Sequence, residues 1–533
     1  MAAPAADSGA RHPDEGLRSG VLKVRHAVIT SLAVITPAAA ILFLPIPIAA
    51  NAGAAMPLSV VVAFAVVLVI MNAVYRFTRR ISHAGSFFAF VRDSLGVRAG
   101  FVTGWLFLAF YPVFVGLDLI LFGATLNGII LAHGGPDIPW WLLMLIGLVL
   151  IWGVAVLGIR LSVRSDLALL TFELGVLLAL ALTILVQGAP GGDWHPHVFS
   201  PGASPAGFSG VVVGAVFGVL AFTGFEAPAY LGEEAENPRR TVPRAILMTT
   251  AAIGVVFVFF FYVTTVGYGL PNIGKLPADP APWDTLGRTY WGSGATILVD
   301  IASVVALIAG ALAAQNGAAR MLFALGRDGL LPRSLGRTLR RFGTPVAALT
   351  VLLGASVAMG LGFGLGFQPL PAFSLLSLVV TLCALGVYAL AQFGLARYFW
   401  LLGKFNPFWH GLVPAAAVAA IVYLFIKNVS PKPPYPSDLA IWISIGWLVA
   451  GILVMAGLVI FKPGRLAEAA VIIGEGDTPE GAGITRSLSL TPRGSDSRKD
   501  HSPCLTPIRR LKSWMCPAHG CTTSGGAAAR CWP

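Results

Sequence analysis

The stretch 222–226, Phe-Thr-Gly-Phe-Glu, interrupts an apolar segment of membrane-spanning length. Gly224 can leave helical backbone angles at little cost, and Thr223 and Glu226 place polar atoms where hydrocarbon is expected. An earlier apolar segment is interrupted at Thr36-Pro37, because proline removes one helical hydrogen bond. Broken backbone at membrane depth is tolerated only where it lines a cavity or is buried in protein. The two interruptions together predict a site for a polar solute.

Each broken helix exposes the N-terminus of one half and the C-terminus of the other. Free N–H groups at the positive end of a helix dipole favour a carboxylate, and free carbonyls favour an ammonium group or another cation. The expected donors are the N–H groups of Ala38, Ala39, Ala40, Phe225 and Glu226. The expected acceptors are the carbonyls of Val34, Ile35, Ala221 and Phe222. A zwitterion such as an amino acid fits this polarity.

Side chains near the two interruptions supply further candidates. The predicted substrate contacts are Ile35, Thr36, Pro37, Ala38, Ala39, Phe222, Thr223, Gly224 and Phe225. Phe222 or Phe225 could form a lid or wall over a substrate, or could simply pack in the core or face lipid. Asp118 could attract a cationic amine. All of these predictions concern a binding site, and none requires a catalytic residue.

Three residues are candidates for ion coupling, because an ionisable or polar group in lipid is costly and is often functional. Glu226 could carry a proton, or cap a half-helix, or do both. Glu173 could carry a proton or hydrogen-bond to a neighbouring helix. Ser303 could help to bind a cation, although a lone serine in a helix usually bonds its own backbone.

The composition indicates a polytopic membrane protein. Of 533 residues, 56% are hydrophobic and 11% charged, and the mean hydropathy is +0.80. Soluble domains carry about 25% charged residues. The net charge of +12 lies largely in short loops, so we expect orientation by positive loops and no nucleic-acid partner. The chain has no phosphate-binding Gly-x-x-x-x-Gly-Lys motif and no catalytic motif, so we expect neither an enzyme nor a cofactor.

Twelve apolar segments predict an all-α protein with twelve transmembrane helices. They are expected at about 26–50, 57–76, 100–132, 138–158, 164–187, 207–230, 245–270, 292–325, 346–366, 371–397, 410–427 and 438–461. The interrupted first and sixth segments would run in opposite directions, as in an inverted five-helix repeat. Residues 81–97 predict an amphipathic helix at the inner membrane surface.

The ends of the chain differ in composition from the segments between them. We expect a disordered cytoplasmic tail over 1–22, a twelve-helix membrane domain over 23–462 and a low-complexity, disordered cytoplasmic tail over 463–533. Arginine is concentrated in alternate loops, which places both termini in the cytoplasm of a multi-pass protein of the plasma or inner membrane. Cys516, His519 and Cys521 lack the spacing of a zinc site, so no metal is expected.

The chain resembles the amino acid–polyamine–organocation permeases over about residues 25–460. The resemblance rests on 222–226, on 232–245 (GEEAENPRRTVPRA), on 316–332 (NGAARMLFALGRDGLLP) and on 84–91 (AGSFFAFV) with Gly104-Trp105. It implies an inverted repeat of five and five helices with discontinuous helices 1 and 6 and two extra helices. It also implies transport of an amino acid or related amine by alternating access with proton coupling or exchange. The chain departs from many members at Thr36-Pro37-Ala-Ala-Ala, where they carry a Gly-rich break.

Several alternatives stay open. The same fold could serve a polyamine or organocation transporter, a non-transporting nutrient sensor or a channel. Some members have a coupling lysine in the fifth segment, and 165–187 contains none. The loop 133–138 contains no cysteine, so no covalent glycoprotein partner is expected. The acidic residues Glu233, Glu234 and Glu236 could form an inner gate with Arg327, or could neutralise arginines of their own loop.

Overall fold

The computed structural model describes residues 23–83, 85–156, 159–188, 196–231, 235–279, 281–327, 331–338, 344–430, 433 and 435–461. Over these residues every long element is a helix, and no strand is present. Long apolar runs take this form because a membrane offers no water to satisfy backbone N–H and C=O groups, so a helix must bond them internally.

The helices follow the predicted apolar segments closely. The first predicted segment is divided into α1 (Val24–Ile35), α2 (Pro37–Phe43) and α3 (Pro45–Ala52). The remaining elements up to the second interruption are η1 (Gly53–Ala55), α4 (Met56–Thr78), α5 (Phe87–Leu95), α6 (Val97–Ala132), α7 (Trp140–Val156), α8 (Ile159–Gln187), η2 (Pro196–Phe199), η3 (Pro201–Ala203) and α9 (Gly207–Phe222).

The second half of the chain continues in the same way. Its elements are η4 (Ala227–Leu231), α10 (Pro238–Tyr268), η5 (Leu270–Ala278), α11 (Pro282–Ala295), α12 (Ile297–Arg327), η6 (Arg333–Gly336), α13 (Val346–Phe367), α14 (Pro369–Leu401), η7 (Pro407–Leu412), α15 (Val413–Val429) and α16 (Leu439–Phe461).

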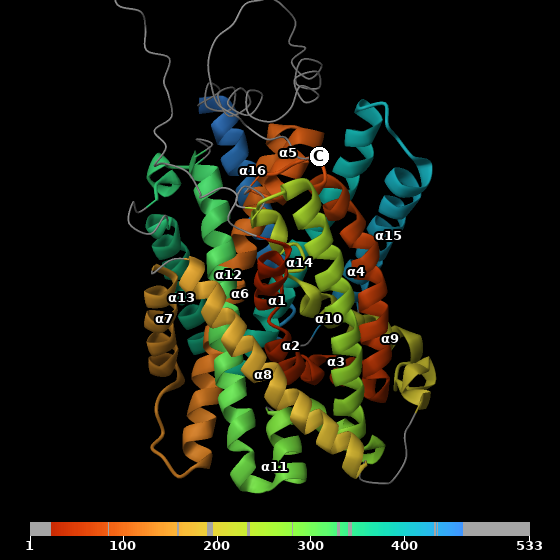
Figure 1. Ribbon diagram of the computed structural model, residues 1–533, viewed down its shortest axis with the longest axis vertical. Helices are drawn as coiled ribbons and strands as arrows, with labels where there is room; N and C mark the ends of the chain where they lie inside the picture. The colour runs from red at the N-terminus through yellow and green to blue at the C-terminus, as the bar shows by residue number, and fades with distance from the viewer. Residues whose placement is uncertain are drawn as a thin grey trace, which may run out of the picture. The chain divides into compact units, whose positions relative to one another are not determined.

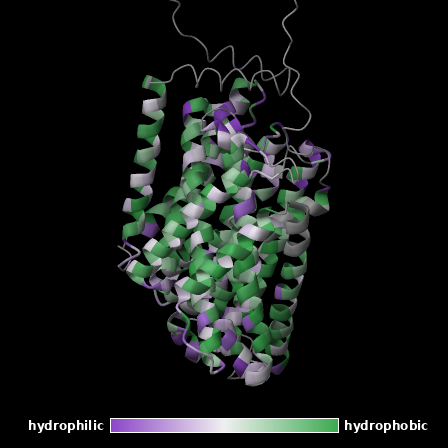
Figure 2. Ribbon diagram, turned by 90° about the vertical axis from the view of Figure 1, so that its left-hand side faces the viewer, coloured by the Kyte–Doolittle hydropathy of each residue, from purple (hydrophilic) through white to green (hydrophobic). Residues whose placement is uncertain are grey.

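By length and composition, ten stretches among the described residues can cross a membrane. They account for ten of the twelve predicted segments. The other two are the divided first segment and α7, which has 17 residues. In the first segment α1 and α2 are too short, and α3 is continuous with α4 in the span Pro45–Thr78. In Figure 2 hydrophobic residues fill the middle of the bundle, and hydrophilic residues gather mainly toward its two ends. The protein is therefore an all-helical, multi-pass membrane protein.

The short helices α1 and α2 lie in the middle of the bundle, with α5 toward one end and α11 at the other (Figure 1). Helix α1 packs against α8, α10, α12 and η4. Long helix α6 packs against α12, α14 and α7, and it is buried over most of 100–123. Tyr111, Phe114 and Asp118 follow one another on α6 at spacings of three and four residues, so they share one face of this helix.

The helix predicted within 81–97 is present as α5, but it does not lie on the surface. Phe87, Phe88 and Phe90 are buried, and α5 packs against α6 and α14. The ring of Phe87 lies 5.3 Å from that of Phe107 and 5.6 Å from that of Tyr388. The apolar face of α5 meets protein instead of lipid, because α6 and α14 already present aromatic side chains at this end of the bundle.

Candidate functional site

The first break separates α1 from α2 at Thr36. This residue has φ 51° and ψ 57°, the left-handed region, and α2 begins at once with Pro37. A proline at the first helical position is pre-organised for a new helix, because its N–H would have no partner there anyway. A left-handed conformation costs a residue other than glycine about 1–2 kcal/mol. The chain thus accepts local strain at a buried position where glycine would relieve it.

The second break follows α9, which ends at Phe222. Thr223 is extended, with φ −61° and ψ 132°, and Gly224 has φ 108°. Only glycine takes such an angle without strain, so this position depends on the absence of a side chain. Two tight bonds then turn the chain, from the Phe225 N–H to the Phe222 carbonyl (3.2 Å) and from the Ala227 N–H to the Gly224 carbonyl (2.9 Å).

The two breaks lie against each other. Helix α1 packs on η4, and the buried Ser31 hydroxyl lies 3.4 Å from the Gly224 carbonyl oxygen and 3.5 Å from that of Phe225. Ser31 therefore joins the helix before the first break to the backbone of the second. The sequence reasoning did not single out Ser31, because a serine on an apolar helix more often bonds its own backbone.

Some of the predicted backbone donors and acceptors are already occupied. The Ala40 N–H donates to the Thr36 carbonyl at 3.0 Å, and the Phe225 N–H donates to the Phe222 carbonyl. Neither N–H is a free donor for a solute in this conformation. Ala38 and Ala39 stand in the first turn of α2, where N–H groups lack intrahelical partners, and the Thr36 side chain provides no cap. The Glu226 N–H is bonded to the carboxylate of the same residue. The N–H groups of Ala38 and Ala39 therefore stay the predicted donors for a solute.

Glu226 closes the second break with side-chain hydrogen bonds. It is fully buried, and its Oε2 accepts the Gly224 N–H at 3.2 Å and the Tyr388 hydroxyl at 3.4 Å. Its Oε1 accepts the Tyr230 hydroxyl at 3.5 Å, and the Tyr111 hydroxyl donates to that of Tyr230. We call Tyr111, Glu226, Tyr230 and Tyr388 the tyrosine–glutamate network. It connects α6, the second break and α14, and the Glu226 carboxylate accepts an N–H group of the break itself, at Gly224.

The three tyrosines of this network were missed by the sequence reasoning. Tyr230 follows Glu226 by four residues, the spacing of one helical turn, and that signal was available. Tyr111 and Tyr388 stand in otherwise apolar segments, where a buried tyrosine hydroxyl needs a polar partner. Nothing local identifies that partner, because Tyr111 and Tyr230 are 119 residues apart and Tyr388 and Glu226 are 162 apart.

Asp118 lies beside the first break. A Cβ built on Gly310 of α12 would come within 2.5 Å of the Thr36 Cγ2 and 3.1 Å of the Asp118 Oδ2. Because Gly310 has no side chain, Thr36 and the Asp118 carboxyl group can both lie next to its backbone. Asp118 is 3% exposed, and its Oδ2 finds no hydrogen-bond partner among the described residues. A buried carboxylate oxygen without a partner is costly unless a proton or a cation neutralises it.

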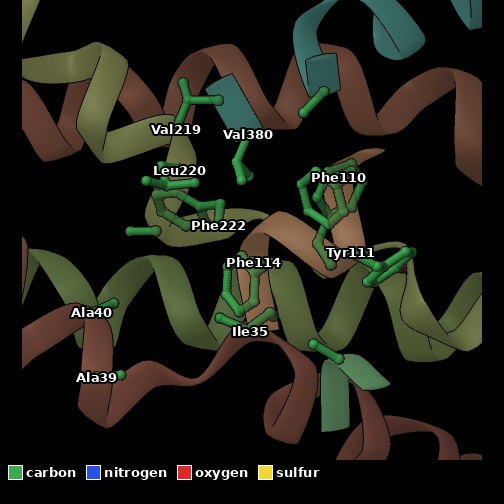
Figure 3. Close-up of a cluster of buried hydrophobic side chains, with 14 of the residues drawn as sticks. Ile35, Ala39, Ala40, Phe110, Tyr111, Phe114, Val219, Leu220, Phe222 and Val380 are labelled. Carbon is green, nitrogen blue, oxygen red and sulfur yellow. The ribbon is translucent and has the colours of Figure 1, made fainter. Parts of the chain in front are cut away.

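The predicted aromatic residues pack in the core. Phe222 is fully buried, stacks on Phe64 at 5.6 Å and meets Phe257 edge-on at 5.1 Å. Phe225 is 1% exposed and lies 5.7 Å from the ring of Tyr388. Figure 3 shows Phe222 in one apolar cluster with residues that flank the breaks, among them Ile35 and Phe114. Both phenylalanines thus pack in the core beside the breaks, which is the alternative to a role as lid or wall, and neither is free to act as a lid in this conformation.

The other candidates lie farther from the breaks or bond locally. The Ser303 hydroxyl donates to the Val299 carbonyl at 2.9 Å, which is the structural alternative considered for it. Glu173 is 3% exposed on α8, the helix that packs against α1 and α2. The Thr223 hydroxyl donates to the Val219 carbonyl at 3.4 Å. Ile35, Pro37, Ala38 and Ala39 are buried around the first break, as a site there requires.

Two further predictions fall largely outside the described residues. Glu233 and Glu234 of the acidic loop are among the residues that the structure does not describe, whereas Glu236 is described and exposed. Cys516, His519 and Cys521 also lie outside the described part of the chain. Within the described ranges, no group of three His, Cys, Asp or Glu side chains could hold a metal ion.

Comparison with known proteins assigns the chain's family. Residues 26–398 match the family described as amino acid permease. The low-affinity putrescine importer PlaP of Escherichia coli K12 is 25% identical over 331 residues, which cover 60% of this chain and 71% of that protein. The branched-chain amino acid permease BcaP of Lactococcus lactis is 27% identical over 334 residues, covering 58% and 68%. The gamma-aminobutyric acid permease of E. coli K12 is 25% identical over 349 residues, covering 63% and 72%.

Proposed function

Because this chain belongs to the amino acid permease family, we propose that it carries an amino acid or small amine across a membrane by alternating access. The observation that carries the proposal is the buried Asp118 carboxyl group beside the strained Thr36 backbone, with its Oδ2 unpartnered. The family consists of transporters and not enzymes. In a transporter, buried polar groups at a helix break can bind the solute that is carried across the membrane.

The first break supplies complementary groups for such a solute. A substrate carboxylate would meet the N–H groups of Ala38 and Ala39 at the start of α2, where the helix dipole favours negative charge. A substrate ammonium group would lie against the Asp118 carboxylate. Relatives of this chain include a putrescine importer, a gamma-aminobutyric acid permease and branched-chain amino acid permeases, and all of these named substrates carry an amine.

The tyrosine–glutamate network would act as a gate. It joins α6 and α14 to the second break through hydrogen bonds that a movement of η4 would have to break. If Glu226 takes up a proton, it loses part of its acceptor capacity, and the network loosens. We propose proton coupling or exchange on this basis, with Glu226 as the coupling residue and Glu173 as a second candidate.

The proposal includes a topology. Twelve transmembrane helices over 23–462 would form an inverted repeat of five and five helices with two extra helices. The interrupted first and sixth helices would be related by that repeat, as in other secondary transporters. The arginine-rich loops would face the cytoplasm, together with both termini, in the plasma or inner membrane.

Uptake into proteoliposomes tests the function. We would measure uptake of radiolabelled putrescine, lysine, gamma-aminobutyric acid and leucine, with and without an inward proton gradient. We expect saturable uptake of at least one of them, increased by the gradient or by the same substrate on the opposite side. Flux that does not saturate would indicate a channel instead, and binding without flux would indicate a sensor.

A pair of glycine variants tests whether the first break is the site. Gly310→Val should abolish uptake, because a Cβ at this position would already crowd Thr36 and Asp118. Gly354→Val on α13 is the matched control, since a Cβ there would meet nothing within 4 Å. Equal uptake by both variants would remove the first break from the substrate site.

A further inference from the structure

A strongly basic cavity lies at the end of the bundle where α4 ends and α10 begins. It has a volume of about 430 Å³, within the range of small-ligand sites. Its basic lining residues are Arg76, Arg79 and Arg80 from the end of α4, Arg239 from the start of α10, and Lys404 and His410 from the segment after α14. No carboxylate is among its described lining residues. The cavity therefore suits an anion, not the amine substrate.

Two of the lining groups are held in place. The Arg76 Nε donates to the Asn72 Oδ1 at 2.9 Å, and the Arg76 guanidinium lies 4.8 Å from the centre of the Trp409 ring. The Asn72 Nδ2 donates in turn to the Trp409 carbonyl at 3.0 Å. The His410 ring is buried and stacks on Phe399, with 3.8 Å between ring centroids. A pre-organised pair of donors costs a ligand little ordering entropy.

The hydrogen bonding of His410 indicates which kind of ligand atom the cavity could bind. The Asn406 N–H donates to the His410 Nδ1 at 2.9 Å, so the neutral ring carries its proton on Nε2. This Nε2 lies 3.5 Å from Nη1 of Arg76, which is also a donor. Two N–H donors thus lie close together at the wall of the cavity. An anionic oxygen placed there would accept from both.

The surroundings of the cavity point to the source of that anion. Trp400, Phe408 and Trp409 are 70%, 51% and 45% exposed around it. Exposed aromatic rings of this kind occupy the boundary between lipid and water. Basic pockets between transmembrane helices at such a boundary bind the phosphates of anionic lipids. We propose that this cavity binds the phosphate of an anionic lipid headgroup, with the acyl chains along the neighbouring exposed apolar residues.

The proposal is independent of the transported substrate. Arg239 stands in the first turn of α10, soon after the second break and η4, whereas Lys404 and His410 follow α14. A phosphate bound by Arg239 on one side and by Lys404 and His410 on the other would link the segment that follows the second break to the α14–η7 connection. Lipid occupancy is therefore expected to alter transport, but the binding site is tested without a transport assay.

The test uses the full chain in nanodiscs of phosphatidylcholine, titrated with phosphatidylglycerol, with bound lipid counted by native mass spectrometry. We expect the wild type to retain phosphatidylglycerol and the double variant Arg79→Gln/Arg239→Gln to bind it more weakly. The expected loss is about fivefold per arginine, which corresponds to about 1 kcal/mol per basic residue near an anionic surface. Both arginines are exposed, so their replacement should leave the fold intact.

The control is Arg244→Gln, which removes the same charge from an exposed position on α10 that does not line the cavity. Equal lipid retention by the double variant, the control and the wild type would overturn the proposal. A second arm titrates delipidated protein with inorganic phosphate and follows its thermal unfolding. If phosphate alone stabilises the wild type but not the double variant, and phosphatidylglycerol binds no more tightly than phosphate, the site is one for a free anion, and the lipid assignment fails.

Discussion

The two breaks solve the same backbone problem in different ways. At the second break, Gly224 takes the unusual angle without strain, and Glu226 accepts hydrogen bonds from the Gly224 N–H and two tyrosines. At the first break, Thr36 takes a strained left-handed angle without a side-chain cap, and the nearby Asp118 Oδ2 has no partner among the described residues. One break is closed by the protein's own polar groups, and the other leaves polar groups available.

This difference supports different proposed roles for the two breaks. Buried polar groups are normally satisfied, so an unsatisfied set at a helix break is where a ligand would gain most from binding. A satisfied network instead resists movement until its hydrogen bonds are exchanged for others. We therefore propose that the first break recognises the substrate and that the second acts as the gate, and the following variants test that division.

The largest effect is expected at Asp118. Asp118→Asn removes the charge that would pair with a substrate amine, and breaking a buried ion pair costs about 3–5 kcal/mol. We expect the apparent affinity for putrescine or lysine to fall by about 100-fold or more. Leucine uptake, if the wild type has it, should fall as well, because the ammonium group of leucine would meet the same carboxylate. The measurement is concentration-dependent uptake into proteoliposomes.

The control for this variant is Asp137→Asn, which removes an exposed carboxylate between α6 and α7. If Asp118→Asn and Asp137→Asn have the same apparent affinity for every transported amine, Asp118 does not bind the substrate, and the first break loses its proposed role in recognition.

The second prediction concerns backbone strain. Gly224→Ala forces a side chain onto a residue with φ 108°, at a cost of about 1–3 kcal/mol. Thr36→Gly should act in the opposite direction, because it relieves a left-handed angle at the first break. Thermal unfolding in detergent compares the two, with Gly354→Ala as the control for adding a methyl group. If Gly224→Ala is as stable as the wild type, the second break is not the rigid element described above.

The third prediction separates gating from recognition. Glu226→Gln keeps an acceptor for a tyrosine hydroxyl but removes the charge and the site for a coupling proton. We expect maximal uptake to fall by about tenfold, the effect of about 1.4 kcal/mol on a rate, and its dependence on the proton gradient to disappear. Substrate binding, measured by scintillation proximity, should be retained. Lost binding with an intact gradient response would place Glu226 in recognition instead.

The sequence predicts local features of this site better than its contacts. Thr36-Pro37 and the stretch 222–226 mark the breaks, because proline and glycine restrict or free the backbone wherever they stand. The polar closure of the second break was only partly predictable, since Tyr111 and Tyr388 reach it from distant helices. Helix α5 shows the same limit: its existence followed from its sequence, but its burial against α6 and α14 depends on tertiary packing.

The smallest effect is expected at Tyr111, the member of the tyrosine–glutamate network that bonds Tyr230 and not Glu226 itself. Tyr111→Phe removes the hydroxyl that donates to Tyr230 but leaves the ring in its aromatic packing against Phe107 and Phe110. A net hydrogen bond contributes about 1 kcal/mol, so we expect a change of about fivefold in the transport rate and little change in substrate affinity. Tyr423→Phe, at an exposed position on α15, is the control. Since Tyr111 and Asp118 lie on the same face of α6, a changed affinity in Tyr111→Phe would mean that the two breaks form one continuous substrate site and do not divide recognition from gating.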